Sequence, residues 1–329
     1  MAYNKYYLQK KQVSYDNGLS WEDVTPLETR QGTYIDSYET LAECEGDYSS
    51  QYLTFESLED NNAISWKANN TGLTKTISAS TDNGNTWASY TSTTGGTTIA
   101  TLNSGDTILF KGLNGQYGNS AGFNYFTTSG NFNVYGNIMS LTSGDSFENA
   151  SLTNAYTFRN LFNSLSGLTS AENLILPSTS LTDSCYLAMF LGCTSLTTAP
   201  TLPATTLTNS CYLHMFNGCS RLTTAPALPA TTLTNSCYSN MFNGCTSLTT
   251  APELPATTLA SYCYYQMFRG CSNLTSITCL ATSISAYYCT TNWVNGVASS
   301  GTFVKAASMS SWTTGVSGIP DGWTVQNNS

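Results

Sequence analysis

Residues 237–259 read Cys237-Tyr-Ser-Asn-Met-Phe-Asn-Gly-Cys-Thr-Ser-Leu-Thr-Thr-Ala-Pro-Glu-Leu-Pro-Ala-Thr-Thr-Leu259, and close copies of this segment lie on both sides of it. Each copy starts 26 residues after the previous one, and a degenerate leading copy without the cysteine pair covers about 156–181. A fixed period of this length indicates stacked units, because one unit alone cannot bury its apolar face. The period is clearest in two series of cysteines: Cys185, Cys211, Cys237, Cys263 and Cys289, and Cys193, Cys219, Cys245 and Cys271.

The apolar spacing within one unit predicts its local structure. Cys237, Met241, Phe242 and Cys245 stand at i, i+4, i+5 and i+8, which predicts a short helix of about two turns. The proline-containing segment 248–255 predicts an extended path with very short or irregular strands. Stacked units would repeat at roughly the strand separation, ~5 Å. The phenylalanines of successive units are therefore predicted to form one stack: Phe190, Phe216, Phe242 and Phe268.

The regular spacing also indicates the state of the cysteines. Disulfide frameworks usually have an even number of cysteines, whereas this chain has 11. Zinc sites favour a shorter Cys-x2–4-Cys spacing than the Cys-x7-Cys found here, and the chain has a single histidine. A free cysteine behaves as a small buried hydrophobe. The periodic cysteines are therefore predicted to be core thiols, with disulfides and a metal site as the alternatives.

The motif Met-Phe-x-Gly-Cys-x-x-Leu-Thr-Thr-Ala-Pro-x-Leu-Pro resembles the BspA-type leucine-rich repeat of Bacteroidales surface proteins and their phages. The segment from Phe268 to Leu280 is similar to the common form of that repeat, and the resemblance covers about residues 150–290. The Tyr-rich start and the closing segment Gly301–Val325 make the whole chain similar to virion-associated proteins of crAss-like Bacteroides phages. This resemblance implies a head-fibre, tail-fibre or decoration protein that attaches to a host.

The region before the repeats has a different pattern. Residues 51–144 contain several short alternating segments separated by Gly and Asn turns, which predicts an antiparallel β-sandwich. Residues 1–50 predict a small β-rich arm, too short for a core of its own, that attaches or oligomerises the chain. Residues 145–290 are predicted to be the leucine-rich-repeat solenoid and 291–329 a C-terminal β cap. The predicted fold class is thus mainly β with short helices.

Composition restricts the class of function. The 329 residues have a formal net charge of −9, which argues against a nucleic-acid partner. Charged residues make up 9% of the chain, against about 25% in typical soluble domains, which favours an extracellular or virion protein. A Sec signal peptide and an apolar run of membrane-spanning length are not apparent, so we expect no membrane insertion and release by a route such as phage lysis.

Two segments share the pattern Ser-x-Asp-x-Gly-x-Ser/Thr-Trp, at 14–21 and at 80–87. The pattern resembles the Asp-box of sialidases and other β proteins. A sialidase needs clustered arginines, whereas Arg30, Arg159, Arg221 and Arg269 are scattered. The preferred interpretation is a hairpin fastener in which Asp bonds turn amides and Trp packs beneath.

Three further features are candidates for binding. The acidic stretch 36–60 has no basic residue and predicts a solvated or docking surface, or a cation site. His214 replaces Ala188, Asn240 and Gln266 at one repeat position, so it is predicted to face solvent. Tyrosines one residue after a cysteine predict either a partly exposed ligand-facing row or lateral packing between units. This row consists of Tyr212, Tyr238 and Tyr264.

The sequence as a whole predicts a non-enzymatic structural and adhesion protein of a bacteriophage virion, without cofactor, metal or catalytic residues. Its expected partners are a capsid or tail protein at the arm and a host glycan or surface protein at the solenoid. A homo-oligomer, dimer or trimer, is also expected, because several weak sites on one particle add avidity. The alternatives are a bacterial cell-surface BspA-like adhesin and, less favoured, a glycan-degrading enzyme, which would need paired carboxylates.

Overall fold

The computed structural model describes residues 12–14, 22–23, 33–34, 48, 50–309 and 312–328. The chain divides into two compact units, Met1–Tyr48 and Ser49–Ser329. The fold is mainly β, as predicted, and its sheets are open. No helix within the described residues has the length and apolar character needed to span a bilayer.

The first unit contains a small antiparallel sheet. Its strands are β1 (Gln12–Ser14), β2 (Glu22–Asp23) and β3 (Thr33–Tyr34), in the order β2-β1-β3. These strands agree with the β-rich character predicted for residues 1–50. The Asp-box segment at 14–21 and the acidic residues at 36–47 lie largely outside the described residues.

The second unit begins with two sheets that face each other. Apolar side chains alternate with polar ones, as in the burial of every second residue of β5. Phe126 of one sheet lies 4.9 Å, between ring centroids, from both Phe55 and Phe110 of the other. One sheet has the order β10-β5-β8 and the other the order β12-β11-β4-β9-β6-β7. The strands of the two sheets are β4 (Leu53–Ser57), β5 (Asn62–Ala68), β6 (Thr76–Ser80), β7 (Ala88–Thr91), β8 (Thr97–Leu102), β9 (Thr107–Lys111), β10 (Asn124–Thr128), β11 (Phe132–Asn137) and β12 (Leu168–Ser170).

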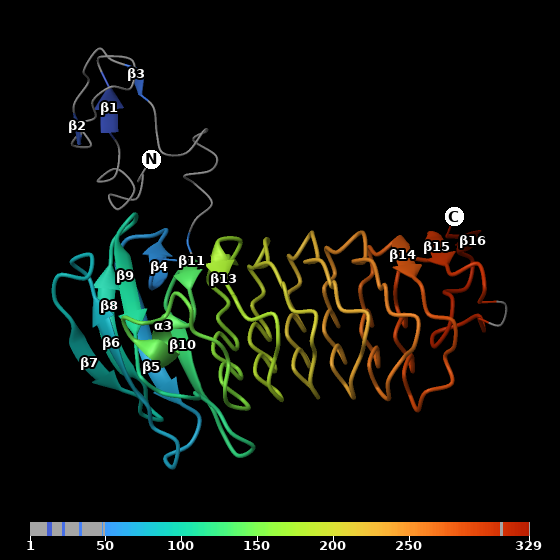
Figure 1. The fold of residues 1–329 in the computed structure, drawn as a ribbon, viewed down its shortest axis with the longest axis horizontal. Coiled ribbons are helices and arrows are strands. Elements are labelled where there is room, and N and C mark those ends of the chain that lie inside the picture. The colour runs from blue at the N-terminus through green and yellow to red at the C-terminus, as the bar shows by residue number, and fades with distance from the viewer. Residues whose placement is uncertain are drawn as a thin grey trace. The chain divides into compact units, whose positions relative to one another are not determined.

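These sheets continue directly into the repeats (Figure 1). Strand β11 pairs in parallel with β12 and with β13 (Leu174–Ile175) of the leading repeat. The ring of Phe126 stacks on Phe162 at 6.2 Å between centroids. The predicted boundaries at 144/145 and 290/291 therefore fall inside one compact unit with a shared core.

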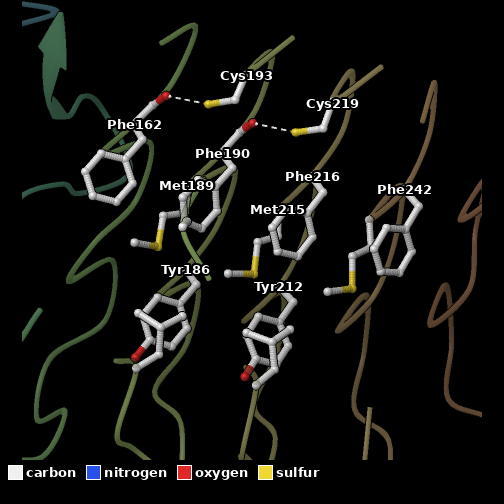
Figure 2. Packing of buried hydrophobic residues seen from close by; sticks show 14 of the residues in the cluster. Phe162, Tyr186, Met189, Phe190, Cys193, Tyr212, Met215, Phe216, Cys219 and Phe242 are labelled. Atoms are coloured by element: carbon white, nitrogen blue, oxygen red, sulfur yellow. Dashed lines mark hydrogen bonds between the residues drawn. The ribbon is translucent and has the colours of Figure 1, made fainter. Parts of the chain in front are cut away.

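The 26-residue units stack in register, as the period predicts. Figure 2 shows neighbouring phenylalanines in one row with methionines beside them. Ring centroids of successive pairs among Phe190, Phe216, Phe242 and Phe268 lie 5.4, 5.7 and 5.8 Å apart, and their planes deviate from parallel by 9°, 7° and 3°. The predicted phenylalanine stack is confirmed. The rings thus stack nearly parallel, at a spacing somewhat larger than the separation of β-strands.

The predicted two-turn helix is wrong. Within the unit at Cys237, the backbone has positive φ at Ser236 (57°), Asn240 (55°) and Gly244 (77°), which an α-helix does not allow. The segment is a run of turns in which N–H groups alternate between two kinds of acceptor. The N–H of Met241 bonds to the Tyr238 carbonyl, three residues back, whereas that of Phe242 bonds to Met267 of the next unit. A helix would use its N–H groups internally, so this segment would lose the bonds that its alternate N–H groups donate to the next unit. Among the described residues the one α-helix is α3 (Ser140–Ser143), outside these turns.

The stack ends in a short parallel sheet. Strand β14 (Ser276–Cys279) pairs with β15 (Thr302–Lys305), which pairs with β16 (Thr324–Asn327). Trp293 extends the tyrosine row, 6.1 Å from Tyr264, and Trp312 stacks on it at 5.8 Å between centroids. Large indole rings thus cover the aromatic core at this end.

Candidate functional site

The tyrosines proposed as ligand-facing are buried, which corrects that prediction. Tyr212, Tyr238 and Tyr264 expose at most 2% of their surface. Their rings stack at 5.9 and 6.3 Å between centroids. Burial raises the pKa of Tyr212 and of Tyr264 well above that of a free tyrosine. The alternative interpretation, packing between units, is confirmed, because the position after the cysteine faces inward in a chain of turns.

His214 is half-buried rather than solvent-facing, and its Nδ1 lies 2.9 Å from the side-chain nitrogen of Asn217. The equivalent residues Ala188 and Asn240 expose 3% and 7%. These positions share a positive φ, 53° to 58°. These repeat positions therefore have a left-handed backbone in common, and not exposure to solvent. Asn and His adopt that backbone more readily than most residues. Burial lowers the pKa of His214, which favours its neutral form.

The cysteines form internal ladders, as predicted. All ten cysteines from Cys185 to Cys289 are free and buried. In the second ladder each thiol lies near the phenylalanine carbonyl of the preceding unit, as in the contact of Cys245 Sγ with Phe216 O at 3.1 Å, and Figure 2 shows two such bonds. Burial raises the pKa of Cys185 to about 12 and of Cys237 to about 11, so thiolate is scarce at neutral pH. Within the described chain no metal-binding group of His, Cys, Asp or Glu forms.

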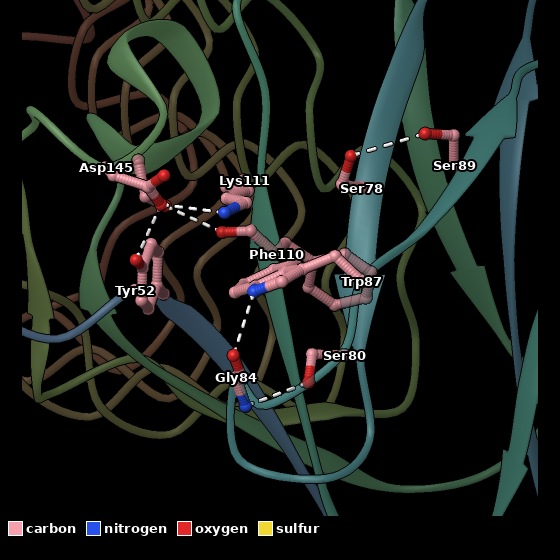
Figure 3. A network of polar contacts seen from close by, with 10 residues as sticks. Tyr52, Ser78, Ser80, Gly84, Trp87, Ser89, Phe110, Lys111 and Asp145 are labelled. Carbon is pink, nitrogen blue, oxygen red and sulfur yellow. Dashed lines mark hydrogen bonds and ion pairs between the residues drawn. The ribbon is translucent and has the colours of Figure 1, made fainter.

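The Asp-box at 80–87 fastens a hairpin, as predicted (Figure 3). The Asp82 carboxylate accepts bonds from the Thr86 N–H at 2.9 Å, the Thr86 hydroxyl at 2.6 Å and the Ser80 hydroxyl at 2.7 Å. These bonds, those of Thr86 first, lower the pKa of Asp82 to about 2. Gly84 has φ 87°, and the Trp87 indole donates to its carbonyl.

A basic side chain covers the Asp-box tryptophan. The Lys111 ammonium lies 4.2 Å from the centroid of the Trp87 ring and 2.7 Å from the Asp145 carboxylate. Tyr52 donates to the same carboxylate at 2.7 Å. The bonds from Lys111 and then Tyr52 lower the pKa of Asp145. Lys111 and Asp145 compensate each other's charge, and because Asp145 is exposed this ion pair links β9 to the loop with at most about 1 kcal/mol.

The described part of the acidic stretch is likewise engaged in the fold. Glu56 accepts from Asn133, and Glu59 accepts from Asn131. Asp60 accepts from the backbone N–H of Ser104 at 3.0 Å. Each of these carboxylates therefore fixes a neighbouring strand or turn.

The exposed aromatic surface lies elsewhere, at Tyr262, Tyr265, Tyr287 and Tyr288, which we call the tyrosine cluster. Tyr287 is 63% exposed and Tyr288 46% exposed, while the other two are half-buried. The Tyr262 ring touches the other three at 5.3 to 5.7 Å between centroids. The Tyr287 and Tyr288 rings are 4.1 Å apart and inclined at 66°. The cluster offers ring faces and edges, with phenol hydroxyls, to the solvent.

Comparison of the repeats could have found this cluster. The residue before the first cysteine is Ser184, Ser210 and Ser236 in three units, but Tyr262 and Tyr288 in the last two. The position before that changes from small polar residues to Tyr287 in the last unit. The tyrosines that repeat are the buried ones, whereas Tyr262, Tyr287 and Tyr288, which break the repeat, form the exposed cluster.

A shallow groove of about 500 Å³ lies on another face of the units. Segments 198–203 and 224–229 of two neighbouring units line it together with Glu172, and prolines and alanines make up about half of the lining residues. The groove exists because Pro200 and Pro226 cannot complete a regular ladder there. Its lining is largely apolar, with the polar side chains of Thr198, Thr201, Thr224 and Glu172 among the apolar ones.

Comparison of the chain with protein-family models, with curated proteins and with solved structures finds no match.

Proposed function

We propose that this chain is a non-enzymatic structural and adhesion protein of a bacteriophage virion, a head or tail fibre or decoration. Residues 145–290 then form a BspA-type leucine-rich-repeat solenoid, closed by the β cap of 291–329. The in-register stack of phenylalanines and the two thiol ladders support this assignment. Residues 51–144 act as a β-sandwich spacer, and residues 1–50 attach the chain to a capsid or tail protein.

One observation carries the binding role. The repeats direct their chemically reactive side chains, thiols and repeated phenols, into the core. The exposed side chains of the repeats are mostly Thr, Ser and Asn, and the tyrosine cluster interrupts them. A weakly charged surface of this kind is suited to a host glycan or surface protein. Affinity per site is modest, so a dimer or trimer displayed in many copies gains avidity.

Experiments on purified particles and on the purified protein test this role. Mass spectrometry of purified phage particles should identify the chain, and gold-labelled antibody should place it on the head or tail. Added soluble protein should compete with particles for host cells. Absence from particles, together with detection on a bacterial cell surface, would overturn the proposal in favour of the BspA-like adhesin. A stable monomer by light scattering would contradict the oligomer.

A further inference from the structure

The tyrosine cluster departs from the repeat, and the other units show which residue the same position normally has. Three units place serine at the position before the first cysteine, with φ between 55° and 57°. Tyr262 and Tyr288 occupy that position with φ 56° and 52°. The left-handed backbone is common to all units, and a bulky side chain is less favourable in it than serine. The stack tolerates serine there, so packing alone does not explain the two tyrosines. The leading unit also has a tyrosine there, Tyr156, but its ring packs against the Arg159 guanidinium at 5.7 Å.

The geometry of the cluster suits a small ligand with both apolar and hydroxyl groups. The Tyr262 ring stands at 81° to Tyr287 and at 62° to Tyr265, so the rings form low walls. The Gln266 amide donates to the Tyr265 hydroxyl at 3.2 Å, which holds one wall. Phenol hydroxyls both donate and accept hydrogen bonds at the edge of each ring.

The low charge around the tyrosine cluster distinguishes between classes of ligand. Residues 260–292 contain one charged residue, Arg269. An anionic sugar or a phosphate requires several cationic or N–H donors, which this segment does not concentrate. A protein partner needs about 1,200–2,000 Å² of total buried surface for a stable complex, whereas the cluster is four side chains. The C–H faces of a neutral pyranose stack on phenol rings, and its hydroxyls bond to the ring edges.

We propose that the tyrosine cluster is a binding site for a neutral glycan, with the exposed rings of Tyr287 and Tyr288 as two separate stacking faces and the half-buried rings of Tyr262 and Tyr265 beside them. This inference rests on the proposed function, because it names the ligand class of the recognition surface. It also stands as a property of the isolated chain, whichever particle or cell carries it.

The decisive variants return the cluster to the repeat consensus. Tyr288→Ser recreates the residue of three other units and relieves backbone strain, so the protein should melt no lower than the wild type. The double variant Tyr287→Asn and Tyr288→Ser also restores the small polar residue of Asn209 and Asn235. The control is Tyr238→Phe, which deletes a buried hydroxyl that has no partner among the described residues and leaves the surface unchanged.

Binding is measured on the full chain by calorimetry and affinity electrophoresis. The neutral probes are cellohexaose, maltoheptaose, fully N-acetylated chitohexaose and mannohexaose, and polygalacturonate is the charged comparison. We expect at least one neutral probe to bind, and the double variant to bind it about tenfold more weakly while Tyr238→Phe binds normally. The proposal is overturned if every neutral probe fails, if only polygalacturonate binds, or if the double variant binds as the wild type does.

Attachment assays on host cells distinguish a glycan ligand from a protein ligand, and their failure can be told apart from failure of the proposed virion function. Periodate treatment of the cells should abolish attachment of the wild-type chain, whereas loss of attachment only after protease treatment assigns the site to a protein and overturns the proposal. If the double variant loses glycan binding but particles lack the chain, the virion assignment fails and the glycan site remains.

Discussion

The rings of Phe216 and Phe242 lie 5.7 Å apart between centroids and within 7° of parallel, although 26 residues separate them. Each ring has a similar neighbour on both sides, so the row transmits its register from unit to unit. Removal of one ring opens a cavity that the rigid row cannot close.

Phe242→Ala should therefore lower the free energy of unfolding by about 3–5 kcal/mol, and Phe242→Leu by clearly less. Urea denaturation followed by far-ultraviolet circular dichroism measures both. A loss below about 1 kcal/mol for the alanine variant would mean that the row does not stabilise the stack.

The buried thiols should be inert in the folded protein. In a Cys44→Ser variant, which leaves the ten described cysteines, Ellman's reagent should react slowly under native conditions because burial raises the thiol pKa. After unfolding in guanidinium without reductant, the same ten thiols should react at once. Nearly complete oxidation in the unfolded sample would refute the thiol ladders.

The Asp82 carboxylate should make the thermal stability of the protein depend on pH in the acidic range. Its pKa of about 2 lies below the unfolded value of about 3.9, so the stabilisation is complete above that value and is lost as pH falls towards 2. The melting temperature of the wild type should exceed that of Asp82→Asn at pH 6, and the gap should close towards pH 2. Thr86→Val removes one hydroxyl donor to the Asp82 carboxylate, so at pH 6 its melting temperature should lie between those of Asp82→Asn and the wild type. An equal gap at both pH values would exclude this linkage.

Ala188 should gain from replacement by glycine. Its φ of 53° strains an alanine by about 1–2 kcal/mol, and the entropy cost of glycine offsets about half of that. Ala188→Gly should stabilise the chain by about 0.5–1 kcal/mol in urea denaturation. Ala204 is equally buried but does not have positive φ, so Ala204→Gly should destabilise it. Identical effects of the two substitutions would argue against the run of left-handed turns.

The buried half of the repeat could be derived from its period. Identical units stacked in register must bring identical residues together, so the phenylalanine row and the free, buried cysteines followed from the spacing alone. The alternation in β5 likewise predicted a half-buried strand. These inferences need only the order of apolar residues along the chain.

The spacing could not distinguish a helix from a run of turns. Inward-facing residues at i, i+4, i+5 and i+8 fit both structures. The two structures differ in the φ of Ser236 and Asn240 and in the hydrogen-bond acceptors of alternate N–H groups. In the run of turns those acceptors lie in the neighbouring unit, so the choice depends on a tertiary contact. The same uncertainty left open whether Tyr238 faces the solvent or packs between units, because the direction of its side chain depends on which turn it occupies.

By itself the sequence determined that 26-residue units stack on a continuous core, because only a stack can bury a strictly periodic set of apolar residues. The tertiary structure decided which tyrosines reach the solvent. Tyr288 occupies the position that is serine in three other units, yet its contact with Tyr262 arises from the stacking of two consecutive units, whose side chains meet only after the backbones have paired.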